Sequence, residues 1–366
     1  MRVLLGALTL AFALVLAGCG GGGQQQEQGG NGGGGGGGET GGGGAASGEI
    51  AIEGSSTVLP ISQAAAEGFQ GENPDARVTV GGSGTGDGFE AFCGGTTQIS
   101  DASRPIESDE IQACEEAGIE FVELPVALDG ISVVVNPEND YATDLTLEEL
   151  STMWSPDSEG SITQWDQVRS GFPAEPFTLY GPGTESGTFD FFTEVVNGEE
   201  GASRADYNAS EDDNVILEGV AGDPSALGYF GYAYFQSAQD AVRAVAIDGG
   251  EGPVEPTPET IADGSYPLSR PLFIYVSTQA LDENPAVAQF VENYLANLDQ
   301  YVEQGGYIAL PSETSQLVQQ RYESRTTGSL YNGEGDLQSG STLQEALQSG
   351  GGSTGGGSTM MSEETT

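Results

Sequence analysis

The chain has 366 residues and carries 56 acidic side chains against nine basic ones, for a net charge of −47. All nine basic residues are arginine, and the sequence contains no lysine or histidine. Such a charge repels nucleic acids and anionic membrane surfaces, and the missing residue types remove the bases of Ser-His and Ser-Lys nucleophilic sites. The electrostatic field of this acidic surface would also repel an anionic ligand unless dissolved salt screens it. Acidic surfaces with arginine in place of lysine resemble those of halophile proteins, so the composition predicts a salt-rich habitat.

The first residues have the pattern of an export signal. Arg2 precedes an apolar stretch over residues 4–17 that is too short for a stop-transfer helix. Cys19 then follows Leu-Ala-Gly, as in the lipobox of bacterial lipoproteins. We expect residues 1–18 to be a lipoprotein signal peptide and Cys19 to carry the lipid, so that the extracytoplasmic protein is tethered to a membrane only by its lipid. An ordinary signal peptide with a chance cysteine is the alternative.

Residues 19–48 are nearly all Gly and Gln and are expected to form a disordered linker. The folded body then begins with a strand over residues 49–53 and a helix over residues 60–70. A strand over residues 77–80, a second helix and a strand from Thr97 follow. This alternation indicates an α/β fold with mostly parallel sheets, in which ligands gather at the carboxyl ends of the strands.

Three apolar runs predict strands that carry the chain between two lobes, at residues 121–128, 130–136 and 270–277. Further elements are expected as helices at 147–154, 189–196, 284–298 and 313–323, and as strands at 177–180 and 241–247. A chain that leaves one lobe, builds another and returns forms a cleft with a hinge. We expect lobe I at residues 49–128 and 271–332, lobe II at 129–270, and a low-complexity tail at 333–366 with a passing helical turn at 343–347.

Three segments place small and hydroxyl residues directly before a helix-like apolar pattern. We call them the first, second and third cradles: Gly54-Ser55-Ser56-Thr57, Gly82-Ser83-Gly84-Thr85-Gly86 and Glu185-Ser186-Gly187-Thr188. The first N–H groups of a helix have no intrahelical partner and carry the positive end of its dipole. One Ser or Thr before a helix is most often an N-cap, but three such segments together predict a joint anion site.

Cys93 and Cys114 remain as a pair once Cys19 is assigned to lipid. In an exported protein they are expected to form a disulfide, worth roughly 3 kcal/mol on the chain-entropy model, and two free buried thiols are the alternative. A zinc site is not expected, because two cysteines without histidine leave too few soft ligands. We expect no metal and no cofactor.

The cradles, in this order and spacing, resemble the phosphate-binding proteins of the high-affinity phosphate ABC transporter, the PstS family. The resemblance covers most of residues 49–331 and includes residues 99–104, 227–232 and 266–271. It implies a two-lobed, type II periplasmic-binding-protein-like α/β fold with hinge crossovers and an interlobe ligand cleft. It also implies a monomeric, non-enzymatic protein that binds inorganic phosphate and delivers it to the transmembrane permease subunits of an ABC importer.

The resemblance also carries phosphate-binding positions onto this chain, namely Ser56, Thr57, Val58, Ser83, Thr85, Ser186, Gly187 and Thr188. The best-known members have an acid where this chain has Arg104, and an arginine shortly before Ser-Gly-Thr, where residues 181–185 contain none. We therefore expect exchanged charges: Arg104 supplies a bidentate guanidinium contact, and Glu185 accepts the proton of monohydrogen phosphate. A surface ion pair is the alternative for Arg104, and a helix-dipole contact without a ligand is the alternative for Glu185.

Other functions remain open from the sequence. A binding protein for sulfate, arsenate or molybdate would use the same donors, and a secreted phosphate-ester hydrolase would need a carboxylate pair such as Glu185 and Asp190. A cell-surface adhesion protein fits the lipid and the linker, although no repeats are visible. The aromatic residues Tyr229, Tyr232, Tyr234 and Phe235 fit a stacking platform for a sugar or base, but their spacing favours core packing.

Overall fold

The structure is a computed structural model that describes residues 46–184, 186–335, 337–338 and 342–350. The described residues belong to one compact unit. None of the helices in these ranges combines the length and the apolar character needed to cross a membrane. The expected signal peptide, Cys19 and residues 19–45 of the expected linker lie outside the described residues, as does Glu185. Within the last residues of the expected linker, Ala46 is buried and β1 begins at Gly48.

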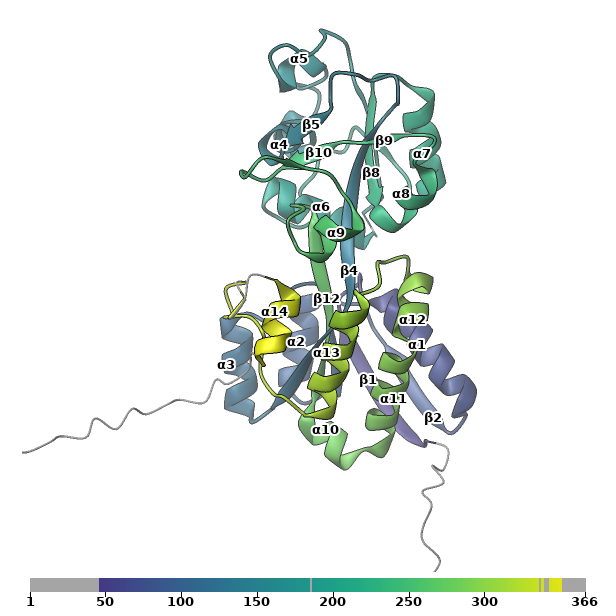
Figure 1. The fold of residues 1–366 in the computed structure, drawn as a ribbon, viewed down its shortest axis with the longest axis vertical. Coiled ribbons are helices and arrows are strands. Elements are labelled where there is room, and N and C mark those ends of the chain that lie inside the picture. The colour runs from purple at the N-terminus through teal and green to yellow at the C-terminus, as the bar shows by residue number, and fades with distance from the viewer. Residues whose placement is uncertain (1–45, 185, 336, 339–341, 351–366) are drawn as a thin grey trace, which may run out of the picture. The chain divides into compact units, whose positions relative to one another are not determined.

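Lobe I is built on parallel strands that alternate with helices, as the sequence predicts (Figure 1). Its strands are β1 (Gly48–Gly54), β2 (Ala76–Val80) and β3 (Ile99–Ala102), and its first helices are α1 (Leu59–Glu72), α2 (Thr85–Cys93) and α3 (Ser108–Ala117). β1 lies between β2 and β3. The carboxyl ends of β1 and β2 therefore lie at the same edge, directly before α1 and α2, where the first two cradles occur.

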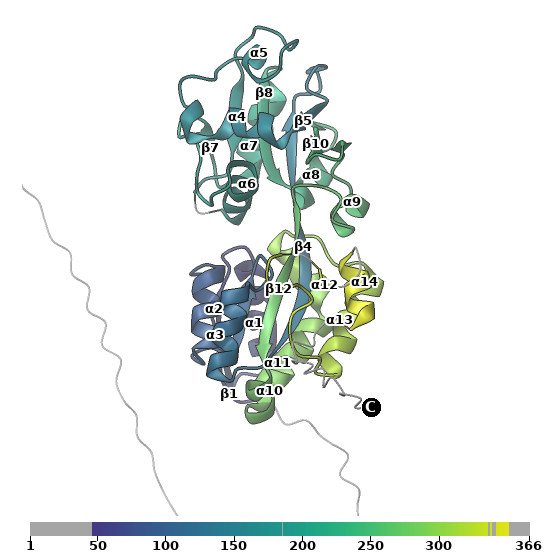
Figure 2. The same ribbon diagram turned by 90° about the vertical axis from the view of Figure 1, so that its left-hand side faces the viewer.

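Two long strands carry the chain between the lobes and lie side by side (Figures 1 and 2). They are β4 (Phe121–Val135), which is buried along its whole length, and β12 (Ser269–Ser277). β4 unites the two runs predicted at 121–128 and 130–136. The sheet order is β2-β1-β3-β12-β4-β8-β6-β7, with β9 also paired to β4. The expectation of mostly parallel sheets is wrong at the crossovers, because a chain that leaves on β4 returns on β12 in the opposite direction.

Lobe II repeats the alternation of strands and helices. Its strands are β5 (Asp144–Thr146), β6 (Thr178–Gly181), β7 (Asn208–Ala209), β8 (Ala226–Gly231), β9 (Arg243–Ala244), β10 (Ala246–Asp248) and β11 (Pro253–Val254). Its helices are α4 (Leu147–Trp154), α5 (Trp165–Val168), α6 (Gly187–Asn197), α7 (Asp213–Gly222), α8 (Tyr232–Ala238) and α9 (Pro258–Ala262). Tyr229 stacks on Phe192 with centroids 3.8 Å apart, and Tyr232 and Phe235 are buried, so these three aromatic residues pack in the core, whereas Tyr234 is only half-buried.

After β12, lobe I is completed by further helices, which are α10 (Thr278–Glu283), α11 (Pro285–Ala296), α12 (Leu298–Gly305) and α13 (Ser312–Glu323). The structure differs from the expectation after Asn332, because α14 (Leu343–Ser349) buries Ala346 and Leu347 and packs against α13. Thr342 caps this helix through its hydroxyl, which accepts from the backbone of Glu345 at 3.2 Å. The apolar stretch there is too short for its periodicity to distinguish a packed helix from a passing turn.

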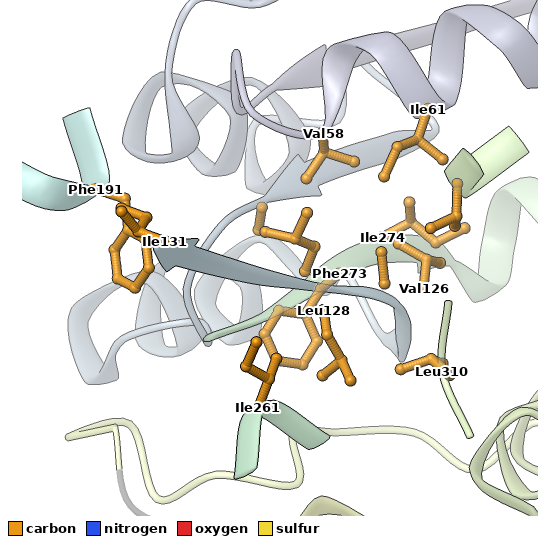
Figure 3. Packing of buried hydrophobic residues seen from close by; sticks show 14 of the residues in the cluster. Val58, Ile61, Val126, Leu128, Ile131, Phe191, Ile261, Phe273, Ile274 and Leu310 are labelled. Atoms are coloured by element: carbon orange, nitrogen blue, oxygen red, sulfur yellow. The ribbon is translucent and has the colours of Figure 1, made fainter. Parts of the chain in front are cut away.

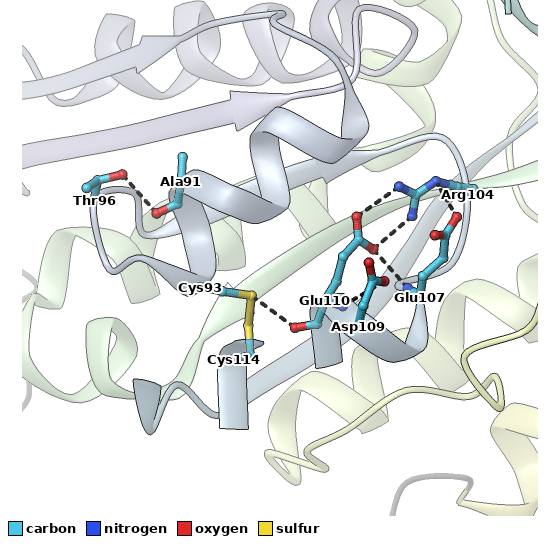
Figure 4. The surroundings of a disulfide bond; sticks show 8 residues. All are labelled: Ala91, Cys93, Thr96, Arg104, Glu107, Asp109, Glu110 and Cys114. Carbon is cyan, nitrogen blue, oxygen red and sulfur yellow. Dashed lines mark hydrogen bonds and ion pairs between the residues drawn. A yellow bond between two sulfur atoms is a disulfide. The ribbon is translucent and has the colours of Figure 1, made fainter. Parts of the chain in front are cut away.

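The buried residues of both lobes form one continuous cluster along the crossover strands, and Figure 3 shows part of it around Leu128, Ile131 and Phe273. The predicted disulfide is confirmed: Cys93 at the end of α2 is bonded to Cys114 in α3, with 2.03 Å between the sulfur atoms (Figure 4). This bond ties the helix that begins at the second cradle to its neighbour. The disulfide therefore cross-links the far end of the second cradle's helix to α3.

Candidate functional site

The first cradle connects β1 to α1. Thr57 and Val58 are buried, and no side chain caps α1. The backbone N–H of Ser55 donates to the carbonyl of Asp101 at 2.9 Å, which fixes the cradle against β3. Gly54 has a φ of 146°, and a Cβ there would lie 2.0 Å from the same carbonyl oxygen. Only glycine allows this approach, so the conformation of the cradle follows from its sequence.

The second cradle lies beside the first. Gly84 directly precedes α2 and has a φ of 111°. Its N–H donates to the carbonyl of Gly54 at 2.9 Å. Thr85 and Ser103 form a hydrogen bond through their hydroxyl groups at 3.0 Å. The N–H of Ser83 donates to a carboxylate oxygen of Glu53 at 3.1 Å. The structure thus brings the first two predicted cradles together at one edge of the lobe I sheet.

The third cradle begins α6 of lobe II and touches the first. Ser186 is the N-cap of α6, and its hydroxyl accepts from the N–H of Thr188 at 3.2 Å. A Cβ on Gly187 would lie 2.5 Å from Thr57 Oγ1 and 3.0 Å from the Cα of Thr57. Helix starts from two lobes, about 130 residues apart in sequence, therefore approach each other closely.

Arg270, at the start of crossover strand β12, contacts both of these cradles. Its Nη2 donates to Thr57 Oγ1 at 3.2 Å and to the carbonyl oxygen of Gly187 at 3.5 Å. Its Nε lies 3.4 Å from a carboxylate oxygen of Asp129 on β4, and its guanidinium lies 3.9 Å from the ring centroid of Phe191. The sequence predicts that Arg270 lies in a crossing between the lobes but indicates no role for it. The signal was an arginine at the predicted hinge, where the two lobes must meet.

Arg104 is engaged differently from the expectation. Its guanidinium forms a bidentate ion pair with Glu110, at 2.9 Å and 2.8 Å, and its Nε lies 3.1 Å from Glu107 (Figure 4). The reason is local, because Glu107 and Glu110 form the capping box of α3 and so place their carboxylates beside Arg104. The bidentate partner of Arg104 in this structure is a carboxylate of its own lobe, and the guanidinium at the first and third cradles belongs to Arg270.

Arg104 nevertheless lines a cavity of about 230 Å³ together with Ser83, Thr85 and Glu194. A second cavity of about 530 Å³ contains Thr188, Asp129 and Tyr307 in its walls. Both cavities combine residues of lobe I or the crossovers with residues of lobe II. Of the predicted hydroxyl residues, Ser83 and Thr85 therefore border the first cavity and Thr188 the second, whereas Ser56, Thr57 and Ser186 line neither of the two.

Asp101, a fully buried residue behind the first two cradles, was not identified from the sequence. Its carboxyl accepts a hydrogen bond from Ser62 Oγ at 2.9 Å. Burial raises its pKa from 3.8 to about 8, and the nearby charge of Glu53 adds to the shift. The carboxyl is therefore protonated at neutral pH and places no negative charge behind the cradles.

Asp129 has a different environment. Burial raises the pKa of its carboxyl, whereas the charge and hydrogen bond of Arg270 oppose that shift. The side chains of Asp129 and Arg270 have exposed fractions of only 2% and 12%. Since both are shielded from water, their attraction is weakly screened, and the carboxylate helps to hold the guanidinium at the crossover.

Comparisons with known proteins agree with this architecture. A family model described as a PBP superfamily domain matches residues 39–297. Protein SphX from Synechocystis is 46% identical over 302 residues, which cover 82% of this chain and 90% of that protein. The phosphate-binding protein PstS from Staphylococcus saprophyticus is 39% identical over 267 residues, which cover 73% of this chain and 82% of that protein.

A solved structure is also similar. The crystal structure of a possible phosphate binding protein from Planctomyces limnophilus has a TM-score of 0.74 and 47% sequence identity, and the alignment covers 76% of this chain and 99% of that one. The similarity thus extends over both lobes and both crossovers. Because the family model matches more than half of the chain and these relatives align with most of it, the chain belongs to the PBP superfamily and, within it, to the PstS-like phosphate-binding proteins.

Proposed function

We propose that this protein captures inorganic phosphate outside the cytoplasm and delivers it to the permease of an ABC importer. The observation that carries the proposal is the approach of Gly187 to Thr57 beside the guanidinium of Arg270. Helix-start amides, hydroxyl groups and a partly buried guanidinium are the donors that a tetrahedral oxyanion accepts. The names of the relatives, which include a phosphate-binding protein, support the same ligand.

The proposed site contains the predicted hydroxyl and backbone donors together with Arg270. We propose Ser56, Thr57 and Val58 from the first cradle, Ser83 and Thr85 from the second, and Ser186, Gly187 and Thr188 from the third. A guanidinium contributes a charge-assisted and directional contact to an anion. Arg104 keeps a proposed role at the rim, because it shares a cavity with Ser83 and Thr85.

Discrimination between phosphate and sulfate requires an acceptor, because monohydrogen phosphate carries a proton that sulfate lacks. We propose Glu185 for this role, as the residue directly before Ser186. A carboxylate there would accept the proton from phosphate and repel fully ionised sulfate. This proposal separates the phosphate site from a general oxyanion site.

The anchoring belongs to the same proposal. We propose that residues 1–18 are removed as a signal peptide, that Cys19 is acylated and that the lipid is the only membrane attachment of a monomeric protein. The relatives include a protein named as phosphate-binding, and we propose that this chain likewise binds its ligand without enzymatic activity. A long Gly-rich linker would let the folded body reach the permease from its anchor.

A thermal-shift screen with phosphate, arsenate, sulfate and molybdate tests this function at high and at low salt. A ligand that binds only the native state stabilises it by about 4 kcal/mol at a thousand times its Kd. Phosphate should therefore raise the melting temperature most, with sulfate well below it. The proposal is wrong if no oxyanion shifts the melting temperature, or if sulfate shifts it more than phosphate does. Release of product from a generic phosphate ester would instead support the hydrolase.

A further inference from the structure

Two consecutive phenylalanines in α6 have different partners. The ring of Phe191 lies against the guanidinium of Arg270, with 3.9 Å between its centroid and the Cζ atom. The ring of Phe192 stacks on Tyr229 and meets the edge of Trp154, at centroid distances of 3.8 Å and 5.5 Å. Both side chains are buried, at 4% and 0% exposure, and Phe191 belongs to the cluster in Figure 3. One ring therefore contacts a charge at the candidate site, and its neighbour packs only in the core of lobe II.

The hydrogen bonds of Arg270 are long, so they fix the orientation of its guanidinium only weakly. They run from the edge of the guanidinium, at 3.2 Å to Thr57, 3.5 Å to Gly187 and 3.4 Å to Asp129. These distances lie at or beyond the long end of the usual range. The Cζ atom of the guanidinium instead lies over the aromatic face, 3.9 Å from the ring centroid, which is the placement favoured for a cation above a ring. These hydrogen bonds are long, and Nη1 has a further ion-pair contact of 3.7 Å with Glu194, so the ring is the close contact that restricts the tilt of the guanidinium.

The position of Phe191 in α6 links this contact to the third cradle. Gly187 and Phe191 are four residues apart and therefore lie on the same face of the helix. The helix start that presents Gly187 to Thr57 thus also presents the ring to Arg270. An arginine ordered before the anion arrives loses less conformational entropy on binding.

We propose that Phe191 is a positioning residue that holds the guanidinium of Arg270 between the first and third cradles and thereby sets the affinity for phosphate. This inference rests on the proposed function, because it assigns a role within the same site. Phe191 acts through Arg270 and need not touch the anion itself. Any side chain with an aromatic face should therefore replace it, whereas an aliphatic one should not.

The test compares Phe191→Leu, Phe191→Tyr and the matched control Phe192→Leu by titration calorimetry with inorganic phosphate. Phe191→Leu should weaken binding about tenfold, which corresponds to about 1.4 kcal/mol, and Phe191→Tyr should bind like the wild type. Phe192→Leu should lower the melting temperature and leave the phosphate Kd unchanged, measured well below that temperature. Phe191→Met, which is closer in volume, takes the place of Phe191→Leu if the latter does not fold.

A second measurement needs no ligand. Phenylglyoxal modifies accessible guanidinium groups, and peptide mass mapping follows the rate at each arginine in phosphate-free protein. Phe191→Leu should accelerate modification at Arg270 and leave Arg104 unchanged. If the wild type fails to bind phosphate, the proposed function fails, and the reactivity of Arg270 still tests the role of Phe191.

Three results would overturn the inference. The first is a wild-type phosphate Kd together with wild-type Arg270 reactivity in Phe191→Leu. The second is an equal loss of affinity in Phe191→Leu and Phe192→Leu, which would indicate general packing of α6. The third is a loss of affinity without any change at Arg270, since Phe191 would then act by another route.

Discussion

The guanidinium of Arg270 donates to the hydroxyl of Thr57 at 3.2 Å, and so joins a residue of a crossover strand to the start of α1. Thr57 is 2% exposed, and Arg270 is 12% exposed at its side chain. The same guanidinium reaches the carbonyl oxygen of Gly187 in α6. A single cation is thus shared by both lobes at the place where the helix starts meet.

Arg270→Ala should weaken phosphate binding by at least about 2 kcal/mol, because hydrogen bonds to charged groups are worth more than neutral ones. Arg270→Lys should recover part of that loss, since it keeps the charge without the planar fork. Calorimetry with phosphate measures both variants. Arg104→Ala is the matched comparison, because the sequence predicts a direct anion contact there, whereas the structure pairs Arg104 with Glu110. A larger loss at Arg104 than at Arg270 would contradict the arrangement described above.

Gly187→Ala should destabilise the contact between α6 and the first cradle by roughly 1–3 kcal/mol, as overpacking usually does. If phosphate binding needs this contact, the affinity should fall by a similar amount. The new methyl group would lie 2.5 Å from Thr57 Oγ1, so α6 and the first cradle must move apart. Gly222→Ala is the control, because a Cβ at the end of α7 meets no atom within 4 Å. Calorimetry gives the affinity, and small-angle scattering with and without phosphate reports closure. Wild-type affinity in Gly187→Ala would show that the contact between the cradles is dispensable.

Asp101→Asn should make the stability of the protein less dependent on pH. The folded-state pKa is raised from 3.8 to about 8, so the folded state holds a proton that the unfolded state releases in this range. The contribution of Asp101 to the free energy of unfolding is then largest at or below pH 3.8 and falls by roughly 1.4 kcal/mol per pH unit up to about pH 8. Urea unfolding at several pH values measures this slope. Asp75→Asn, at an exposed position, should leave the slope unchanged, and a slope retained in Asp101→Asn would refute the assignment.

Glu185→Gln should relax the discrimination between phosphate and sulfate more than it weakens phosphate binding. The amide keeps the size of the side chain but removes the charge that repels sulfate, and its N–H₂ group is a donor. Competition calorimetry with both anions measures the ratio of the two Kd values. An unchanged ratio would remove Glu185 from the proposed site.

Breaking the disulfide, with Cys93→Ser and Cys114→Ser together, should destabilise the protein by roughly 3 kcal/mol. The bond joins the end of α2 to α3 and not to the cradles themselves. The melting temperature should therefore fall, while the phosphate Kd measured below it stays close to that of the wild type. Mild reduction of the wild-type protein is the parallel experiment and should lower the melting temperature to a similar extent.

The local parts of this protein could be predicted from the sequence. The strand before Gly54, the helix after Val58 and the helix over residues 147–154 follow from apolar periodicity and from start signals that lie within a few residues of each other. The pairing of Cys93 with Cys114 followed from elimination. In each case the information is contained in the segment itself or in a very small set of choices.

The tertiary structure decided which distant residues meet. Nothing near Arg270 in the sequence indicates Thr57 as its partner, because they are 213 residues apart and are brought together by β12 entering the sheet beside β3 and β4. Arg104 differs, because its carboxylate partner is local: the capping box of α3 places Glu110 beside it. Local patterns thus determine where helices start and donors are exposed, whereas long-range packing determines which charge reaches them. An ion pair depends on separations of a few ångströms, which only the folded chain defines.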